Sequence, residues 1–170
     1  MKRLLPFVVL FLGILLLAGA GFYLWHAAQA PAPVAVGKDV PDSLGGLSLT
    51  QTLSGRAATA NIEQLHGTDF PLISGFVAEY GQKNATLWVA VTSSETQAAE
   101  LVKKMEASIA KGTSPFKPRG VFQIKNRDIY MLDGMNQSNF YFQSGAKVIW
   151  LSVNEAQAEQ GMGDALAFYP

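Results

Sequence analysis

The spacing of apolar and polar positions predicts strands alternating with helices from residue 47 onward. Residues 47–53, LSLTQTL, alternate apolar and polar side chains, as half-buried strands do. The next segment has apolar residues at helical spacing (Ala58, Ile62 and Leu65) and is expected to end at Gly67. Residues 75–81 and 85–93 then predict a hairpin, in which Leu87, Val89 and Val91 share one face.

A second helix is predicted over residues 95–111, and its boundaries carry the usual signals. Ser94 and Gln97 have the spacing of a capping box at its start, and Gly112 is suited to close its end. Its apolar positions recur every three or four residues and predict one buried stripe, made of Ala98, Leu101, Val102, Met105 and Ile109.

The C-terminal half predicts four more strands joined by short turns, which favours an antiparallel meander. These strands lie near residues 121–126, 128–132, 138–143 and 147–153. Asn154 is expected to cap a final helix over residues 155–168. The order β-α-β-β-α-β-β-β-β-α indicates an α+β fold, a twisted and mostly antiparallel sheet with two or three helices packed on one face.

The N-terminal segment predicts a membrane anchor. Residues 4–25 carry no charge and would span roughly 33 Å as a helix, against a hydrocarbon core of about 30 Å. Lys2 and Arg3 precede this span, so residues 1–3 are expected in the cytoplasm and the rest outside, in the periplasm or the extracellular space. Residues 26–43 form a linker rich in proline and alanine, and residues 44–170 form the extracytoplasmic domain. Signal cleavage at a small-residue site, which would make the protein secreted, is the alternative.

Composition and charge narrow the chemistry that this domain can use. The chain has no cysteine, which removes disulfides, thiolate nucleophiles and cysteine metal sites. Its net charge is zero, so nucleic acid is not an expected partner of the exported domain. The charge is unevenly placed, however, because residues 103–127 hold one acid, Glu106, and seven basic residues: Lys103, Lys104, Lys111, Lys117, Arg119, Lys125 and Arg127. This run predicts either a solvated surface or a patch for an anionic partner.

Glu63, His66 and Asp69 are the only residues whose spacing suggests a metal site. A Glu-x-x-His pair on one helical face can bind a divalent cation, and His66 would be the general base of an envelope hydrolase. Against this, Gly67 is expected to end the helix, and a histidine in a last turn also suits the negative end of the helix dipole. The chain has no hydrolase elbow and no phosphate-binding glycine loop. We therefore expect no catalytic residue, no metal and no cofactor, with the hydrolase as the alternative.

Residues 113–120, TSPFKPRG, are predicted to form a loop that contacts a partner. Its prolines restrict the chain, Phe116 offers an apolar anchor, and Lys117 and Arg119 offer two cations. The alternative is that Phe116 lies in the core and the cations are merely solvated. The leading hypothesis is thus a membrane-tethered extracytoplasmic binding domain, whose partner is an envelope protein or an anionic surface. A structural subunit of a membrane-associated assembly is a further alternative.

Overall fold

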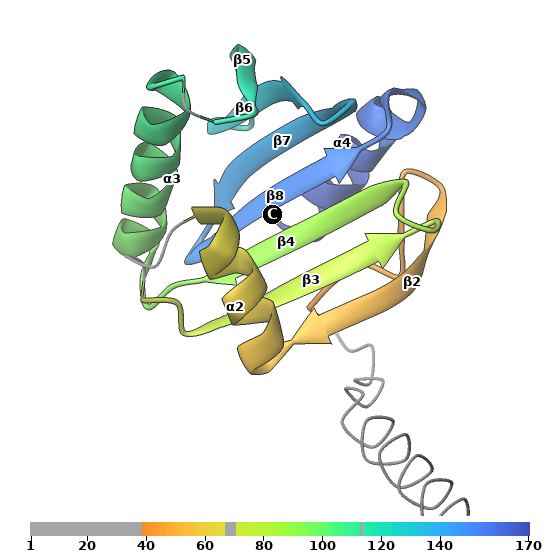
Figure 1. The fold of residues 1–170 in the computed structure, drawn as a ribbon, viewed down its shortest axis with the longest axis horizontal. Coiled ribbons are helices and arrows are strands. Elements are labelled where there is room, and N and C mark those ends of the chain that lie inside the picture. Colours follow the sequence, from red (N-terminus) through yellow and green to blue (C-terminus); the bar gives the residue numbers. More distant parts are fainter. Residues whose placement is uncertain (1–38, 67–70, 113) are drawn as a thin grey trace, which may run out of the picture. The chain divides into compact units, whose positions relative to one another are not determined.

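The computed structural model describes residues 39–66, 71–112 and 114–170, which form one eight-stranded antiparallel sheet with helices on it (Figure 1). The strands are β1 (Ser43–Leu44), β2 (Leu47–Ser54), β3 (Ser74–Tyr80), β4 (Ala85–Val91), β5 (Lys117–Ile124), β6 (Arg127–Gly134), β7 (Gln137–Ser144) and β8 (Lys147–Val153). The helices are α2 (Gly55–His66), α3 (Glu95–Ala110) and α4 (Ala158–Phe168), and a 3-10 turn, η1 (Glu155–Gln157), precedes α4. The predicted α+β order is confirmed, with the two-residue β1 added.

The sheet joins the predicted hairpin and the predicted meander along its centre. Its strand order is β1-β2-β3-β4-β8-β7-β6-β5, and every neighbouring pair is antiparallel. The meander β5–β8 therefore returns its last strand to β4, where Trp88 lies opposite Trp150. This arrangement leaves β5 at one edge of the sheet and β1 at the other.

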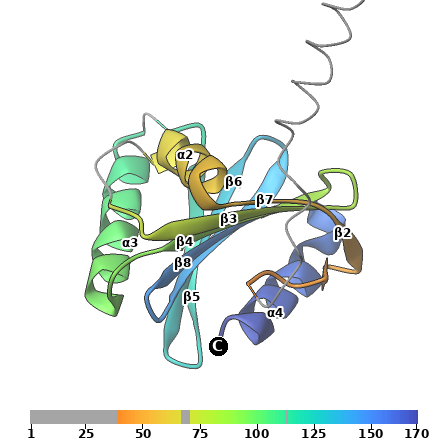
Figure 2. The same cartoon turned by 90° about the horizontal axis from the view of Figure 1, so that it is seen from below.

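Helices cover both faces of the sheet, which corrects the expectation of a single covered face. Figure 2 shows α2 and α3 on one side of the central strands and α4 on the other. The reason is that the central strands are apolar on both sides: Leu87 and Val89 pack in the core under α4, whereas Ala90 packs under α2 and α3. Strand β7 also contributes to both faces, since Phe140 and Phe142 face the α4 side and Tyr141 faces the other, as the alternation of side chains along a strand requires.

The helix α3 begins and ends close to the residues that the sequence predicts. Ser94 Oγ accepts a hydrogen bond from the Gln97 N–H at 3.2 Å, and the Gln97 side chain accepts from the Ser93 N–H at 3.3 Å. The second bond of the expected capping box therefore reaches one residue further back. Gly112 has φ of +73°, as a left-handed residue after a helix requires, and the predicted apolar stripe is the buried face of the helix.

Two local predictions are wrong. Asn154 does not cap the last helix with its side chain; instead its amide donates to Asn84 Oδ1 at 3.0 Å, which ties together the turn before β4 and the end of β8. Residues 113–120 are not one loop, because the strand β5 already begins at Lys117. Pro118 is tolerated there since β5 is an edge strand, where a missing N–H need not cost a ladder bond.

The predicted tail and anchor, and the linker up to residue 38, lie outside the described residues. Within residues 39–66, 71–112 and 114–170, no helix is long and apolar enough to cross a membrane.

Candidate functional site

The residues of the suggested metal site are only partly described. Glu63 and His66 both belong to α2, whereas Asp69 and the side chain of His66 lie outside what the structure describes. Among the side chains that it does describe, no three histidine, aspartate or glutamate residues could jointly hold a metal ion. The hydrolase centred on His66 therefore stays a prediction.

The three predicted partner-binding residues are placed side by side, but in different environments. Phe116 is half-buried and packs edge-on against Trp150, with ring centroids 4.8 Å apart. Lys117 and Arg119 are exposed at the start of β5, and Arg119 Nη1 lies 3.7 Å from an Asp133 carboxylate oxygen. A second carboxylate, that of Glu155, lies 3.8 Å from Arg119. Two exposed acids thus already lie close to Arg119, so its guanidinium is less available to an anionic partner than an unpaired cation would be.

Phe116 belongs to a row of aromatic side chains on the α3 side of the sheet. Tyr130, Tyr141 and Trp150 occupy paired positions on β6, β7 and β8. Their rings stack with centroids 4.5 Å apart for the two tyrosines and 5.4 Å apart for Tyr141 and Trp150. Aromatic cross-strand pairs of this kind stabilise a sheet, so most of the row is core. Its outer end, Tyr130, is only half-buried and lines a cavity.

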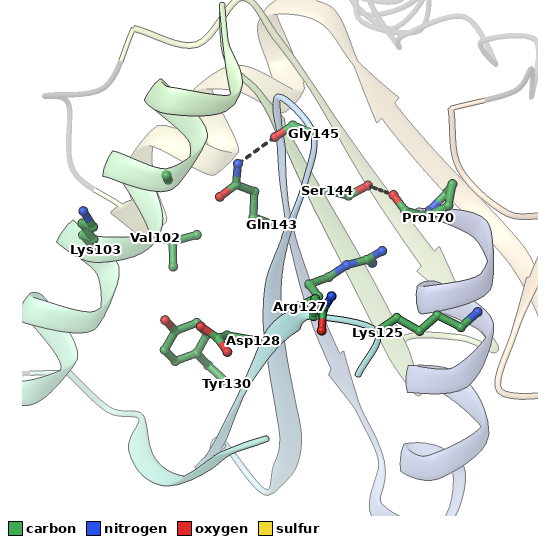
Figure 3. A pocket seen from close by; sticks show the side chains of 12 residues that line it. Val102, Lys103, Lys125, Arg127, Asp128, Tyr130, Gln143, Ser144, Gly145 and Pro170 are labelled. Carbon is green, nitrogen blue, oxygen red and sulfur yellow. Dashed lines mark hydrogen bonds between the residues drawn. The ribbon is translucent and has the colours of Figure 1, made fainter. Parts of the chain in front are cut away.

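This cavity has a volume of about 460 Å³ and lies between α3 and one end of strands β6 and β7 (Figure 3). Its walls come from four parts of the chain. They are lined by Ala99, Val102 and Lys103 of α3, by the β5–β6 turn and the start of β6 (Lys125, Asn126, Arg127, Asp128, Tyr130), by the end of β7 and the following turn (Gln143, Ser144, Gly145), and by Pro170.

The basic character of the cavity depends on the turn between β5 and β6. Lys125 and Asn126 have φ of 52° and 63°, and Ile124 pairs with Arg127, so they form a two-residue turn of type I′. This turn brings Lys125 and Arg127 to the same end of the sheet as Lys103 of α3. The cavity is therefore bordered by three cations and by one side-chain carboxylate, Asp128.

The three cations are not held in the same way. Arg127 is fixed, because its Nη1 donates to the Tyr169 carbonyl oxygen at 2.6 Å and its guanidinium lies 5.4 Å from the centre of the Phe142 ring. Lys103 and Lys125 are exposed and form no ion pair with any residue in the described part of the chain. Figure 3 shows Lys103 on the α3 side of the cavity and Lys125 and Arg127 on the other side, so the three cations border the cavity from opposite sides.

The floor of the cavity adds a hydroxyl and a small apolar surface. Burial raises the pKa of the Tyr130 hydroxyl, and the nearby carboxylates of Glu106 and Asp128 raise it further. Tyr130 therefore keeps its proton at neutral pH and is available as a hydrogen-bond donor. Beside it, Val102 and Ala99 offer apolar contacts. Such a site suits an anionic group carried by a partly apolar molecule.

Sequence reasoning found the basic run but not this site. Lys103, Lys125 and Arg127 all belong to the run of seven basic residues, yet nothing local in the sequence separates them from the other four. Comparisons of the chain with protein-family models, with curated proteins and with solved structures gave no match. The candidate site therefore rests on its own geometry and charge.

Proposed function

We propose that this chain is a membrane-tethered extracytoplasmic binding domain that holds an anionic group in the basic cavity. The observation that supports the proposal is the gathering of Lys103, Lys125 and Arg127 around one concave site with a single side-chain carboxylate. Cationic side chains that border one concave surface attract anions to it. A partner with exposed carboxylate or phosphate groups, such as an envelope protein or an anionic surface, fits this chemistry.

The tether is part of the same proposal. Residues 4–25 would cross the membrane, with residues 1–3 in the cytoplasm and residues 26–43 as a spacer that lifts the domain from the bilayer. The uncharged length of the segment and the basic residues that precede it support this orientation. The domain would then meet its partner outside the cytoplasm while remaining close to the membrane surface.

The test replaces the two unpaired lysines without disturbing the backbone. Lys125→Asn removes a cation while keeping a residue type that tolerates the left-handed conformation at this position. Lys103→Gln removes a second cation, on the exposed face of α3. The matched control is Lys83→Asn, because Lys83 also has a positive φ, 72°, but lies in the β3–β4 turn at the other end of the strands.

The measurement is the affinity of the full chain, reconstituted in uncharged nanodiscs, for inorganic phosphate at low salt. A charge removed about 6 Å from the anion costs about 1 kcal/mol at a partly exposed site, so each cavity variant should weaken binding roughly fivefold. The Lys83→Asn control should bind like the wild type. Equal phosphate affinity in all four proteins, or an equal loss in the control, would contradict the proposal.

A further inference from the structure

We infer that β5 is a docking edge, and that it accepts an extended acidic segment of a partner protein as a ninth strand of the sheet. Strand β5 ends the strand order and is hydrogen-bonded, within the described part of the chain, to β6 alone (Figure 1). An unpaired edge presents backbone donors and acceptors that another strand can use, and proteins that recognise peptides use such edges. This edge adjoins the basic cavity proposed above as the anion site, because Lys125 of the β5–β6 turn borders both, whereas Lys103 of α3 lines the cavity.

The pairing with β6 shows which backbone groups of β5 are free. In a hairpin closed by a two-residue type I′ turn, the flanking residues Ile124 and Arg127 exchange hydrogen bonds, and the bonding alternates from there along the strand. Phe122 therefore directs its N–H and C=O toward β6. Val121 and Gln123 direct theirs outward, where a further strand would lie.

The usual defences of an edge strand are confined to the first half of β5. Lys117 and Pro118 oppose strand addition there, and the register shifts between Pro118 and Gly120. From Val121 onward β5 has regular pairing, no proline and no charge up to Ile124. Val121 is 56% exposed. The second half of the edge thus has an unpaired backbone and two exposed side chains, Val121 and Gln123.

Charge specifies the partner. Residues 113–127 contain no acid, and two exposed lysines flank the open part of the strand, Lys117 at the start of β5 and Lys125 in the turn that follows it. The acids Asp128 and Asp133 lie on β6, one strand further in, and Asp128 already accepts a hydrogen bond from Gln123 at 2.9 Å. A strand added to β5 would meet the cations first. Acidic residues flanking a short apolar stretch are therefore the complementary sequence.

The same charges reject a second copy of the chain. An antiparallel pair of two β5 strands centred on Phe122 would place Arg119 opposite Lys125 of the other copy. Centring the pair on Val121 would oppose Lys117 to Lys125, the first residue of the turn after β5. These two registers set like charges against each other, which disfavours self-association in either of them.

The test uses the full chain in uncharged nanodiscs and a synthetic peptide in which threonine and valine alternate between glutamate-flanked ends. A control peptide carries lysine in place of every glutamate. We expect the acidic peptide to bind, to shift the amide resonances of Val121 and Gln123, and to slow their hydrogen exchange. Binding of the lysine peptide as tightly as the acidic one, or protection elsewhere in the sheet, would overturn the inference.

Substitutions in β5 test whether the peptide binds through the backbone of the edge and through its cations. Val121→Pro removes one outward N–H without removing a bond to β6, and should weaken peptide binding about tenfold or more. Val121→Thr keeps that N–H and should bind within about threefold of the wild type. Lys117→Glu should weaken binding by roughly two- to fivefold, and this holds as an independent test if the proline variant misfolds. Unchanged binding in a folded Val121→Pro variant or in Lys117→Glu would overturn the inference.

A cavity variant separates this surface from the proposed anion site. Lys103→Gln lies on α3 and does not touch β5's free edge, so it should leave peptide affinity unchanged while it lowers phosphate affinity. Loss of peptide binding in Lys103→Gln would show that the peptide occupies the cavity, and would overturn the docking edge.

Discussion

Replacing Asn139 by leucine should strongly destabilise the fold, because this side chain is the centre of a buried hydrogen-bond network. Asn139 lies on β7 and is fully buried. Its amide donates to the carbonyl oxygens of Gly134 at 3.2 Å and Gln137 at 2.9 Å. Its Oδ1 accepts from Trp150 Nε1 at 3.2 Å and from the hydroxyl of Ser152. One side chain therefore joins the β6–β7 turn to β8.

The magnitude follows from these four hydrogen bonds. Each contributes about 1 kcal/mol net, and a buried group stranded by the loss of its partner costs about 1–3 kcal/mol. Leucine has a shape similar to that of asparagine and leaves little cavity, and its apolar burial offsets part of the loss. We expect Asn139→Leu to lower the free energy of unfolding by about 2–4 kcal/mol, a large share of a typical total of about 5–15 kcal/mol.

Urea unfolding followed by tryptophan fluorescence and circular dichroism measures this change. The m-value should stay constant, which shows that stability and not the unfolded state has changed. Ser152→Ala provides the second arm of a double-mutant cycle, because its hydroxyl bonds to Asn139. Adding Ser152→Ala to Asn139→Leu should cost less than it costs alone, since the stranded hydroxyl is removed. A loss below about 1 kcal/mol for Asn139→Leu, or full additivity in the cycle, would refute the reasoning.

Three further outcomes are expected. Burial raises the pKa of the hydroxyls of Tyr80 and Tyr169 above the ordinary value of 10, so the folded protein keeps protons that the unfolded chain loses; stability should be complete below about pH 10 and fall at higher pH, with tyrosinate absorbance appearing together with unfolding. Gly134→Ala would force a Cβ into the ring of Phe116, and thermal melts should show a loss of about 1–3 kcal/mol, whereas Gly120→Ala, with open space around it, should cost less. Deleting residues 1–30 should release a soluble, folded domain from the membrane fraction; aggregation of that fragment would contradict the proposed tether.

Local patterns were enough to predict most of the elements. The stripe of α3 and the cap at Ser94 depend on residues within one or two turns of each other, so a short window of sequence contains the relevant interactions. The two local errors arose where a distant partner intervened. Asn154 bonds to Asn84 instead of capping, and Lys117 joins a strand because Asp133 lies opposite it on β6.

The placement of helices on both faces was a different kind of error. A strand that is apolar on both sides can be read as central, but the sequence does not say which helix covers which side. That choice followed from the pairing of β4 with β8, which builds one sheet from two hairpin systems and leaves an apolar surface on each face. Once α2 and α3 occupy one face, α4 is left to cover the other.

The sequence by itself therefore determined the elements, their order and the inward faces, because hydrophobic periodicity and capping act over a few residues. It also showed where the basic residues lie along the chain. Only the tertiary structure decided which of them share a site: Lys103 and Lys125 line one cavity, from opposite sides (Figure 3), because α3 packs beside the ends of β6 and β7. The free edge of β5 was decided in the same way, since a strand becomes an edge through the pairing of the whole sheet; Lys117 and Pro118 suit an edge strand but do not by themselves assign that position.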